Sequence, residues 1–235
     1  MLGLGNSIVS GVALGDLASE IEAGNLAVLP SIEHWFKYNT GITHNAGSPD
    51  FKVTQWDDQI SSKHWLASAD HPVYDSTTGA LKFNGASKVM ITTDGTSADI
   101  ELDGNFAVYL RIKFATTPSS SDIFFKDASS SNNFLRANSA TVIRAKITSG
   151  SLNWTVPTMG TSAYHNIGIE RSGTAVRVYL DGTESETGAI TASNTWNIDT
   201  LKGGLDDLFK TLIIVKGEAL TADTRPALNT YLNTL

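Results

Sequence analysis

The most regular pattern along the chain is an alternation of apolar and polar positions that predicts β-strands. Along residues 106–114, every second position is a large apolar residue: Phe106, Val108, Leu110, Ile112 and Phe114. Successive side chains of a strand point to opposite faces of a sheet, so this pattern predicts a strand with one buried face. The opposite face carries Ala107, Tyr109, Arg111 and Lys113.

Other segments of the same kind predict a protein built mainly of strands. Residues 167–171 and 174–180 flank a short turn that contains Gly173, which is typical of a β-hairpin. The segment 212–215 is apolar on both faces, which predicts a central strand covered on both sides. Further strands are expected at residues 141–148 and, as shorter ones, around residues 80–83, 88–92, 123–125 and 196–198.

One helix is expected, near the end of the sequence. Leu228, Tyr231, Leu232 and Leu235 follow the i, i+3, i+4, i+7 spacing of an apolar helix face. Many short strands with frequent turns indicate a sandwich or a barrel, and hairpins make its strands antiparallel. We therefore predict an all-β fold, an antiparallel two-sheet jelly-roll sandwich over residues 31–235 that ends in a short C-terminal helix.

Residues 1–30 differ from the rest because glycines interrupt an apolar segment. We expect them to form an extended N-terminal arm, with a short helix over residues 16–23, that attaches the sandwich to a neighbouring chain. An exposed apolar arm needs such a partner. The residues proposed to bind that partner are Leu2, Leu4, Ile8, Val9, Val12 and Leu14. The alternative is that the segment packs on its own domain as additional edge strands.

Composition narrows the function classes of this 235-residue chain. Because the chain has no cysteine, it has no disulfide, thiolate metal site or cysteine nucleophile. A formal net charge of −7, with no cluster of Lys and Arg, argues against a nucleic-acid partner. Neither membrane insertion nor a signal peptide is expected, since no apolar run is long enough to span a bilayer and the first basic residue is Lys37.

Several short motifs occur in an order that resembles a known family. They are Trp56-Asp57-Asp58-Gln59, His71-Pro72-Val73-Tyr74, Leu81-Lys82-Phe83-Asn84-Gly85, Val178-Tyr179-Leu180-Asp181-Gly182, Gly204-Leu205-Asp206-Asp207 and Leu220-Thr221-Ala222-Asp223. Over residues 50–235 this order is similar to that of LamG-type domains of the concanavalin A-like lectins and glucanases. Residues 1–6 and 35–43 resemble structural proteins of marine bacteriophages. The resemblance implies a jelly roll that belongs to a phage particle.

Catalytic and metal-binding candidates are few. Glucanases of the concanavalin A-like fold carry a Glu-x-Asp-x-x-Glu strand, which this sequence lacks. Glu184 and Glu186 follow a turn in a polar segment, where an acid does not acquire the raised pKa that general acid catalysis needs. We therefore expect no enzymatic activity. Many relatives of that fold bind a calcium ion through loop carboxylates, so Asp94, Asp99 and Asp103 are weak candidates for Ca²⁺, and no other cofactor is expected.

The predicted outward strand positions suggest a binding surface. Basic and aromatic residues expected there are Tyr109, Arg111, Lys113, Arg144, Lys146, Arg177 and Tyr179. They form either a solvated face that opposes aggregation or a patch that contacts an acidic capsid subunit or surface polysaccharide. Trp154 and Trp196 are candidates for stacking on sugars or for the core.

Two functions follow as hypotheses. The first is a virion structural protein, a capsid decoration or tail-connector module, held by the N-terminal arm to other virion proteins. It would be made in the host cytoplasm and would form a homo-oligomer, as virion appendages usually do. The alternative is a host-recognition module in a tail fibre that binds cell-surface carbohydrate.

Overall fold

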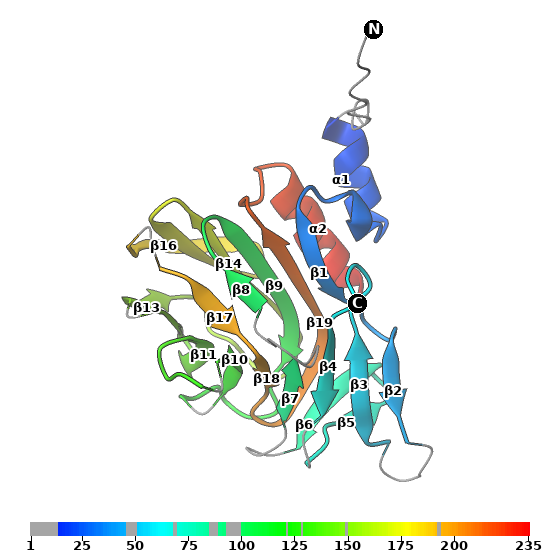
Figure 1. Cartoon of the computed structure of the whole chain (residues 1–235). Coiled ribbons are helices and arrows are strands. Elements are labelled where there is room, and N and C mark those ends of the chain that lie inside the picture. The colour runs from blue at the N-terminus through cyan, green and yellow to red at the C-terminus, as the bar shows by residue number, and fades with distance from the viewer. Residues whose placement is uncertain are drawn as a thin grey trace, which may run out of the picture.

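The computed structural model describes residues 14–45, 51–67, 70–84, 89–92, 100–120, 122–127, 129–148, 150–191 and 194–235. Most of these residues belong to antiparallel strands, which confirms the predicted all-β class. Two large sheets, here called sheet A and sheet B, make up the body (Figure 1). A two-stranded sheet of β17 (Trp196–Ile198) and β8 (Ile100–Leu102) joins them.

Sheet A contains eight of the described strands, seven of them in the order β16-β15-β14-β9-β19-β6-β5, with β1 paired to β19. Their bounds are Thr183–Ala189, Ala175–Leu180, His165–Ser172, Phe106–Lys113, Leu205–Lys216, Ala80–Asn84, Val73–Asp75 and, for β1, Ile32–Phe36. The predicted hairpin is β14–β15, and the predicted central strand, residues 212–215, is the C-terminal part of β19.

Sheet B contains nine of the described strands in the order β13-β12-β11-β10-β18-β7-β4-β3-β2. Their bounds are Gly150–Thr155, Val142–Ile147, Phe134–Ser139, Ile123–Lys126, Thr200–Lys202, Val89–Thr92, His64–Ala67, Val53–Asp57 and Ile42–His44. The inner faces of the two sheets enclose one hydrophobic core, which confirms a two-sheet sandwich. Trp56, Trp65, Trp154 and Trp196 are all fully buried there.

A second hydrophobic cluster covers the outer face of sheet A. The C-terminal helix α2 (Thr224–Thr234) confirms the predicted helix and buries Leu228 and Leu232 against that face. The helix α1 (Leu14–Glu22) packs beside α2 (Figure 1). Because side chains of β9, β15 and β19 join this cluster, the central part of sheet A is buried on both of its faces.

The N-terminal segment differs from the extended arm expected for residues 1–30. Helix α1 is followed by a short 3₁₀ helix, η1 (Leu26–Val28), and Ile21, Leu26 and Leu29 are buried in the cluster on sheet A. Residues 17–30 therefore belong to the folded body and pack on it as helices rather than as edge strands. Of the predicted partner-binding residues, Leu14 begins α1, and Leu2, Leu4, Ile8, Val9 and Val12 lie outside the described residues.

Candidate functional site

The predicted patch of basic and aromatic residues is divided between the two sheets. Tyr109, Arg111 and Tyr179 lie on the outer face of sheet A, where they are 3%, 9% and 3% exposed. Their expected exposure is wrong because α2 packs over this face, which strand alternation alone does not reveal. Tyr109 and Tyr179 belong to the hydrophobic cluster under α2, and the Tyr109 hydroxyl donates to Glu170 Oε1 at 2.5 Å.

Two further members of the patch are also on sheet A. Arg177 is accessible, but its Nε lies 3.0 Å from Glu184 Oε1. Lys113 ends β9 and is half-buried. The sheet A part of the predicted patch is therefore largely covered by the helix or paired with a carboxylate.

Arg144 and Lys146 lie instead on the outer face of sheet B, and they identify the candidate site. Along β11 and β12 the inner positions are buried, namely Leu135, Ala137, Ile143, Ala145 and Ile147. The alternate positions point outward and are half-buried. In Figure 1 both helices lie on the β1 and β19 side of the molecule, away from β10–β13. We call the group Lys126, Phe134, Arg136, Arg144, Lys146 and Lys202 the basic face.

Strand pairing brings the members of the basic face together. Arg136 lies directly opposite Arg144, and Phe134 lies opposite both Lys146 on β12 and Lys126 on β10. The guanidinium carbons of Arg136 and Arg144 lie 5.0 and 5.9 Å from the centre of the Phe134 ring. Cation–π attraction of this kind holds both guanidinium groups over the strand pair.

The pKa values of two cations of the basic face, Arg136 and Lys202, are lowered. Burial lowers the pKa of Arg136, and the charge of Arg144 lowers it further. Burial likewise lowers the pKa of Lys202, and the charge of Lys126 adds to the effect. Among ion pairs between described residues, none involves a member of the basic face.

An open hollow of about 360 Å³ adjoins the basic face. It is lined by Ile123, Lys126, Asp127, Ser130, Ser131, Asn133, Phe134 and Arg136. The carboxylate of Asp127 is engaged by the backbone N–H and hydroxyl of Ser129 and by the Asn133 amide. The hollow thus combines two cations with polar side chains on an exposed edge of the face.

Because Arg136 and Arg144 face each other across two strands, we expect their repulsion to lower the stability of the protein. Like charges directly opposite one another in a sheet are destabilising by roughly 0.2–1 kcal/mol. We expect Arg144→Glu to raise the free energy of unfolding by about that amount, because a carboxylate then faces Arg136. Urea denaturation at low salt measures the change, and Arg177→Glu, which breaks a pair on sheet A, is the control that lowers stability. A loss of stability in Arg144→Glu contradicts the repulsion.

The calcium candidates do not form a described site. Asp103 is exposed, and its Oδ1 lies 3.3 Å from Lys216 Nζ. The hydrogen bond with this lysine lowers the pKa of Asp103. Asp94 and Asp99 lie outside the described residues. Within the described part of the chain, no group of three or more His, Asp or Glu residues is arranged to hold a metal ion.

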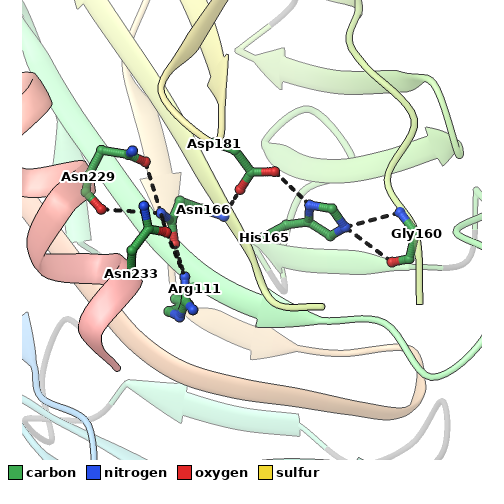
Figure 2. A network of polar contacts seen from close by, with 7 residues as sticks. All are labelled: Arg111, Gly160, His165, Asn166, Asp181, Asn229 and Asn233. Atoms are coloured by element: carbon green, nitrogen blue, oxygen red, sulfur yellow. Dashed lines mark hydrogen bonds and ion pairs between the residues drawn. The ribbon is translucent and has the colours of Figure 1, made fainter. Parts of the chain in front are cut away.

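Two histidine–carboxylate pairs occur elsewhere. In the network of Figure 2, His165 Nδ1 lies 2.8 Å from Asp181 Oδ2, and this hydrogen bond raises the pKa of His165. The Gly160 backbone N–H lies 3.0 Å from His165 Nε2, so both ring nitrogens have partners within the protein. The pair ties the loop before β14 to the β15–β16 turn.

The second pair joins His34 to Asp58. His34 Nδ1 lies 2.7 Å from Asp58 Oδ2 and 3.2 Å from the hydroxyl of Ser61. Burial raises the pKa of Asp58, but hydrogen bonds from His34, Ser61 and the backbone outweigh it, so that the pKa is lowered overall. A serine and a carboxylate on the same ring nitrogen differ from a catalytic triad, in which they contact opposite nitrogens.

The tryptophans considered for sugar stacking belong to the core. Trp154 and Trp196 are 1% and 0% exposed and face inward between the sheets. Sequence reasoning found Arg144 and Lys146 but missed Lys126, Phe134, Arg136 and Lys202. The alternation of residues 134–137 with 143–147 was the available signal for Phe134 and Arg136.

Comparison with known proteins identifies the fold but no family. No protein-family model matches the chain, and no curated protein sequence is similar to it. Among solved structures, Trypanosoma rangeli sialidase in complex with sialic acid superposes with a TM-score of 0.57 and 10% identity, over 96% of this chain and 40% of that one. The chain thus spans about two fifths of the length of the sialidase.

Two further solved structures superpose on this chain with TM-scores close to that of the sialidase. Domain 4 of AbnA, a GH43 extracellular arabinanase from Geobacillus stearothermophilus in complex with arabinotriose, matches with a TM-score of 0.52 and 15% identity, over 86% of this chain and 98% of that one. The binding domain of Paraclostridial Mosquitocidal Protein 1 matches with a TM-score of 0.56 and 9% identity, over 84% and 53%. At these identities the likeness shows the fold alone.

These neighbours correct the expectation that the chain is not an enzyme. A sialidase and a domain of an arabinanase share its fold, so the fold gives no ground for that expectation. The expectation rested on the absence of one glucanase motif, and a fold can carry different chemistries through different residues. What the structure shows is an all-β sandwich of a kind found in carbohydrate-active proteins.

Proposed function

We propose that the chain is a carbohydrate-binding sandwich module, related to the concanavalin A-like domains, that holds a saccharide on the outer face of sheet B. Among its structural neighbours are a sialidase bound to sialic acid and an arabinanase domain bound to arabinotriose. A saccharide is also the ligand expected under the second hypothesis from the sequence, a host-recognition module. Saccharide binding requires an accessible surface with polar groups.

The observation that carries the proposal is the contrast between the two outer faces. On sheet A, the cluster under helices α1 and α2 buries outward side chains of β9, β15 and β19, among them Tyr109, Tyr179 and Ile213. On sheet B, the outward side chains of β10–β12 remain accessible beside the open hollow. The hydroxyls of Ser130 and Ser131 at this hollow are hydrogen-bonding groups of the kind that orient a sugar hydroxyl.

Blocking the hollow tests the proposal without altering any charge. Ser131 is exposed on its rim, and Ser131→Trp places a bulky ring there. We expect the wild-type protein to retain saccharides on a glycan array that includes sialosides and arabino-oligosaccharides, and Ser131→Trp to weaken that binding at least tenfold. The matched control is Ser162→Trp, at an exposed serine outside the hollow. Equal binding by both variants contradicts this placement of the site.

A role in a phage particle is a separate proposal that rests on the resemblance of residues 1–6 and 35–43. In this role, the sandwich is a decoration, connector or fibre module that contacts other virion proteins. Because residues 17–30 belong to the folded body, residues 1–13 would be the part of the predicted arm that attaches the module. Quantitative mass spectrometry of purified virions tests this role. Hundreds of copies per particle indicate a capsid location, a few copies indicate a tail or fibre, and absence contradicts the proposal.

A further inference from the structure

The basic face gathers five cations on neighbouring strands of an acidic protein, and no carboxylate of the described residues forms an ion pair with any of them. The chain carries 24 acidic and 17 basic residues. Away from the basic face, each of four cations lies within 3.3 Å of a carboxylate: Lys82, Arg177, Lys216 and Arg225. The five cations of the basic face have no such contact among the described residues. In an acidic protein, a face of this kind is a local positive potential.

The side chains of the face are partly held in place before any ligand binds. Arg136 donates to Asn138 Oδ1 at 3.2 Å and to the Ser120 carbonyl at 3.4 Å. Arg144 donates from Nε and Nη2 to the Ser151 hydroxyl at 3.2 and 3.0 Å. With Phe134 beneath both guanidinium groups, little side-chain freedom is lost when they engage an anion.

One donor within this arrangement has no partner. Arg136 Nε is buried and makes no hydrogen bond to the described protein. A buried N–H of this kind costs free energy until it is satisfied. The guanidinium fork matches the geometry of a carboxylate or a sulfate, which accepts two parallel hydrogen bonds.

The cations also extend across four neighbouring strands in two adjacent rows, with Arg144 opposite Arg136 in one row and Lys146 and Lys126 on either side of Phe134 in the other. Neighbouring strands are about 4.8 Å apart, and the order β12-β11-β10-β18 carries Arg144 and Lys146, then Arg136, then Lys126, then Lys202. A linear ligand that lies across these strands meets a cation on each of them. This arrangement favours a chain with repeated anionic groups over a single small anion.

We infer that the saccharide held on sheet B is an acidic polysaccharide, whose carboxylate or sulfate groups are bound by the Arg136–Arg144 pair and by Lys126 and Lys202 on the next two strands. This inference rests on the proposed function and adds the chemical class of the ligand. The face then gains from the ligand the counter-charges that the protein itself does not supply.

The test compares ligands of the same kind that differ in charge. Alginate oligosaccharides carry carboxylates, carrageenan oligosaccharides carry sulfates, and dextran oligosaccharides are neutral. Isothermal titration of the full chain at 50 and 200 mM NaCl measures each dissociation constant. We expect at least one acidic series to bind tenfold or more tightly than dextran, and to weaken at the higher salt because exposed charges are screened.

A charge-removing double variant tests the location. Arg136→Gln with Arg144→Gln keeps polar side chains and removes a repulsion, so the sheet remains folded, which circular dichroism verifies. We expect at least a tenfold loss of acidic-oligosaccharide binding. The control, Lys82→Gln with Arg177→Gln, removes the same charge elsewhere and leaves binding within twofold.

The other outcomes separate this inference from the proposed function. If neutral and acidic oligosaccharides bind equally tightly at the hollow, the inference of an acidic ligand is overturned, but the proposed saccharide-binding function is retained. If polyglutamate or duplex DNA binds as tightly as the acidic saccharides, the face selects for charge alone, and the inference that its ligand is a saccharide is overturned. If the Arg136/Arg144 variant binds acidic oligosaccharides as tightly as the wild-type protein does, the proposed location of the site is overturned. Failure to bind any saccharide contradicts the proposed function itself.

Discussion

Glu170→Ala should destabilise the protein by about 3 kcal/mol, because it leaves the buried Tyr109 hydroxyl and the half-buried guanidinium of Arg225 without their acceptor. Glu170 is 4% exposed in the centre of sheet A. Its two carboxylate oxygens accept hydrogen bonds from Arg225 Nε and Nη2 at 2.8 and 2.9 Å. Arg225 belongs to α2, so this pair fastens the C-terminal helix to the sheet.

The same carboxylate also satisfies the buried hydroxyl of Tyr109. Burial raises the pKa of Tyr109 well above its ordinary value, and the charge of Glu170 raises it further, so the phenol stays protonated and donates. Glu170→Ala therefore removes the partner of the buried Tyr109 hydroxyl and of the half-buried Arg225 guanidinium at once. The side chain of Arg225 also stacks on Tyr179, at 4.5 Å from the ring centre, and would lose its orientation.

Chemical denaturation with urea measures this loss. Glu184→Ala is the matched control, since it breaks an accessible pair with Arg177 and should cost about 1 kcal/mol or less. The double variant Glu170→Leu with Arg225→Leu should recover part of the stability, because apolar residues leave no buried charge. If Glu170→Ala costs no more than Glu184→Ala, the pair does not fasten α2.

The strands of the fold were predictable where local alternation is strong. Residues 106–114 and the 167–180 hairpin are strands as expected, because a period of two in apolar residues reports directly on a buried face. The same reasoning placed Tyr109 and Tyr179 in solvent. Which outer face a helix covers depends on packing between α2 and sheet A, segments that are far apart in the sequence.

The candidate site was predictable only in part, because part of it depends on the pairing of strands that are far apart in the sequence. Arg144 and Lys146 follow from alternation along one strand, and the short turn between β11 and β12 places Arg136 opposite Arg144. Lys126 and Lys202 join them because β10 pairs with β18, whose residues lie far later in the chain. No local pattern encodes a pairing of that range, nor does it reveal that neither of the described helices α1 and α2 covers β10–β13.

Trp196→Ala is the second substitution with a large expected effect. Trp196 is fully buried, and its ring lies 5.5 Å from that of Phe106 on β9 and 5.2 Å from that of Phe125 on β10, measured between ring centres. It therefore joins the two sheets across the core. Truncation of a buried tryptophan to alanine costs about 3–5 kcal/mol, as lost burial and a residual cavity.

This substitution should also weaken ligand binding, because Phe125 immediately precedes Lys126 of the basic face. With Trp196 removed, β10 loses its inner support, and Lys126 is no longer held opposite Phe134. Urea denaturation and titration with an acidic oligosaccharide measure the two effects on one preparation. Trp196→Phe keeps an aromatic ring between the sheets and should retain most of both properties. A Trp196→Ala protein as stable as Trp196→Phe would show that the sheets are held together without this contact.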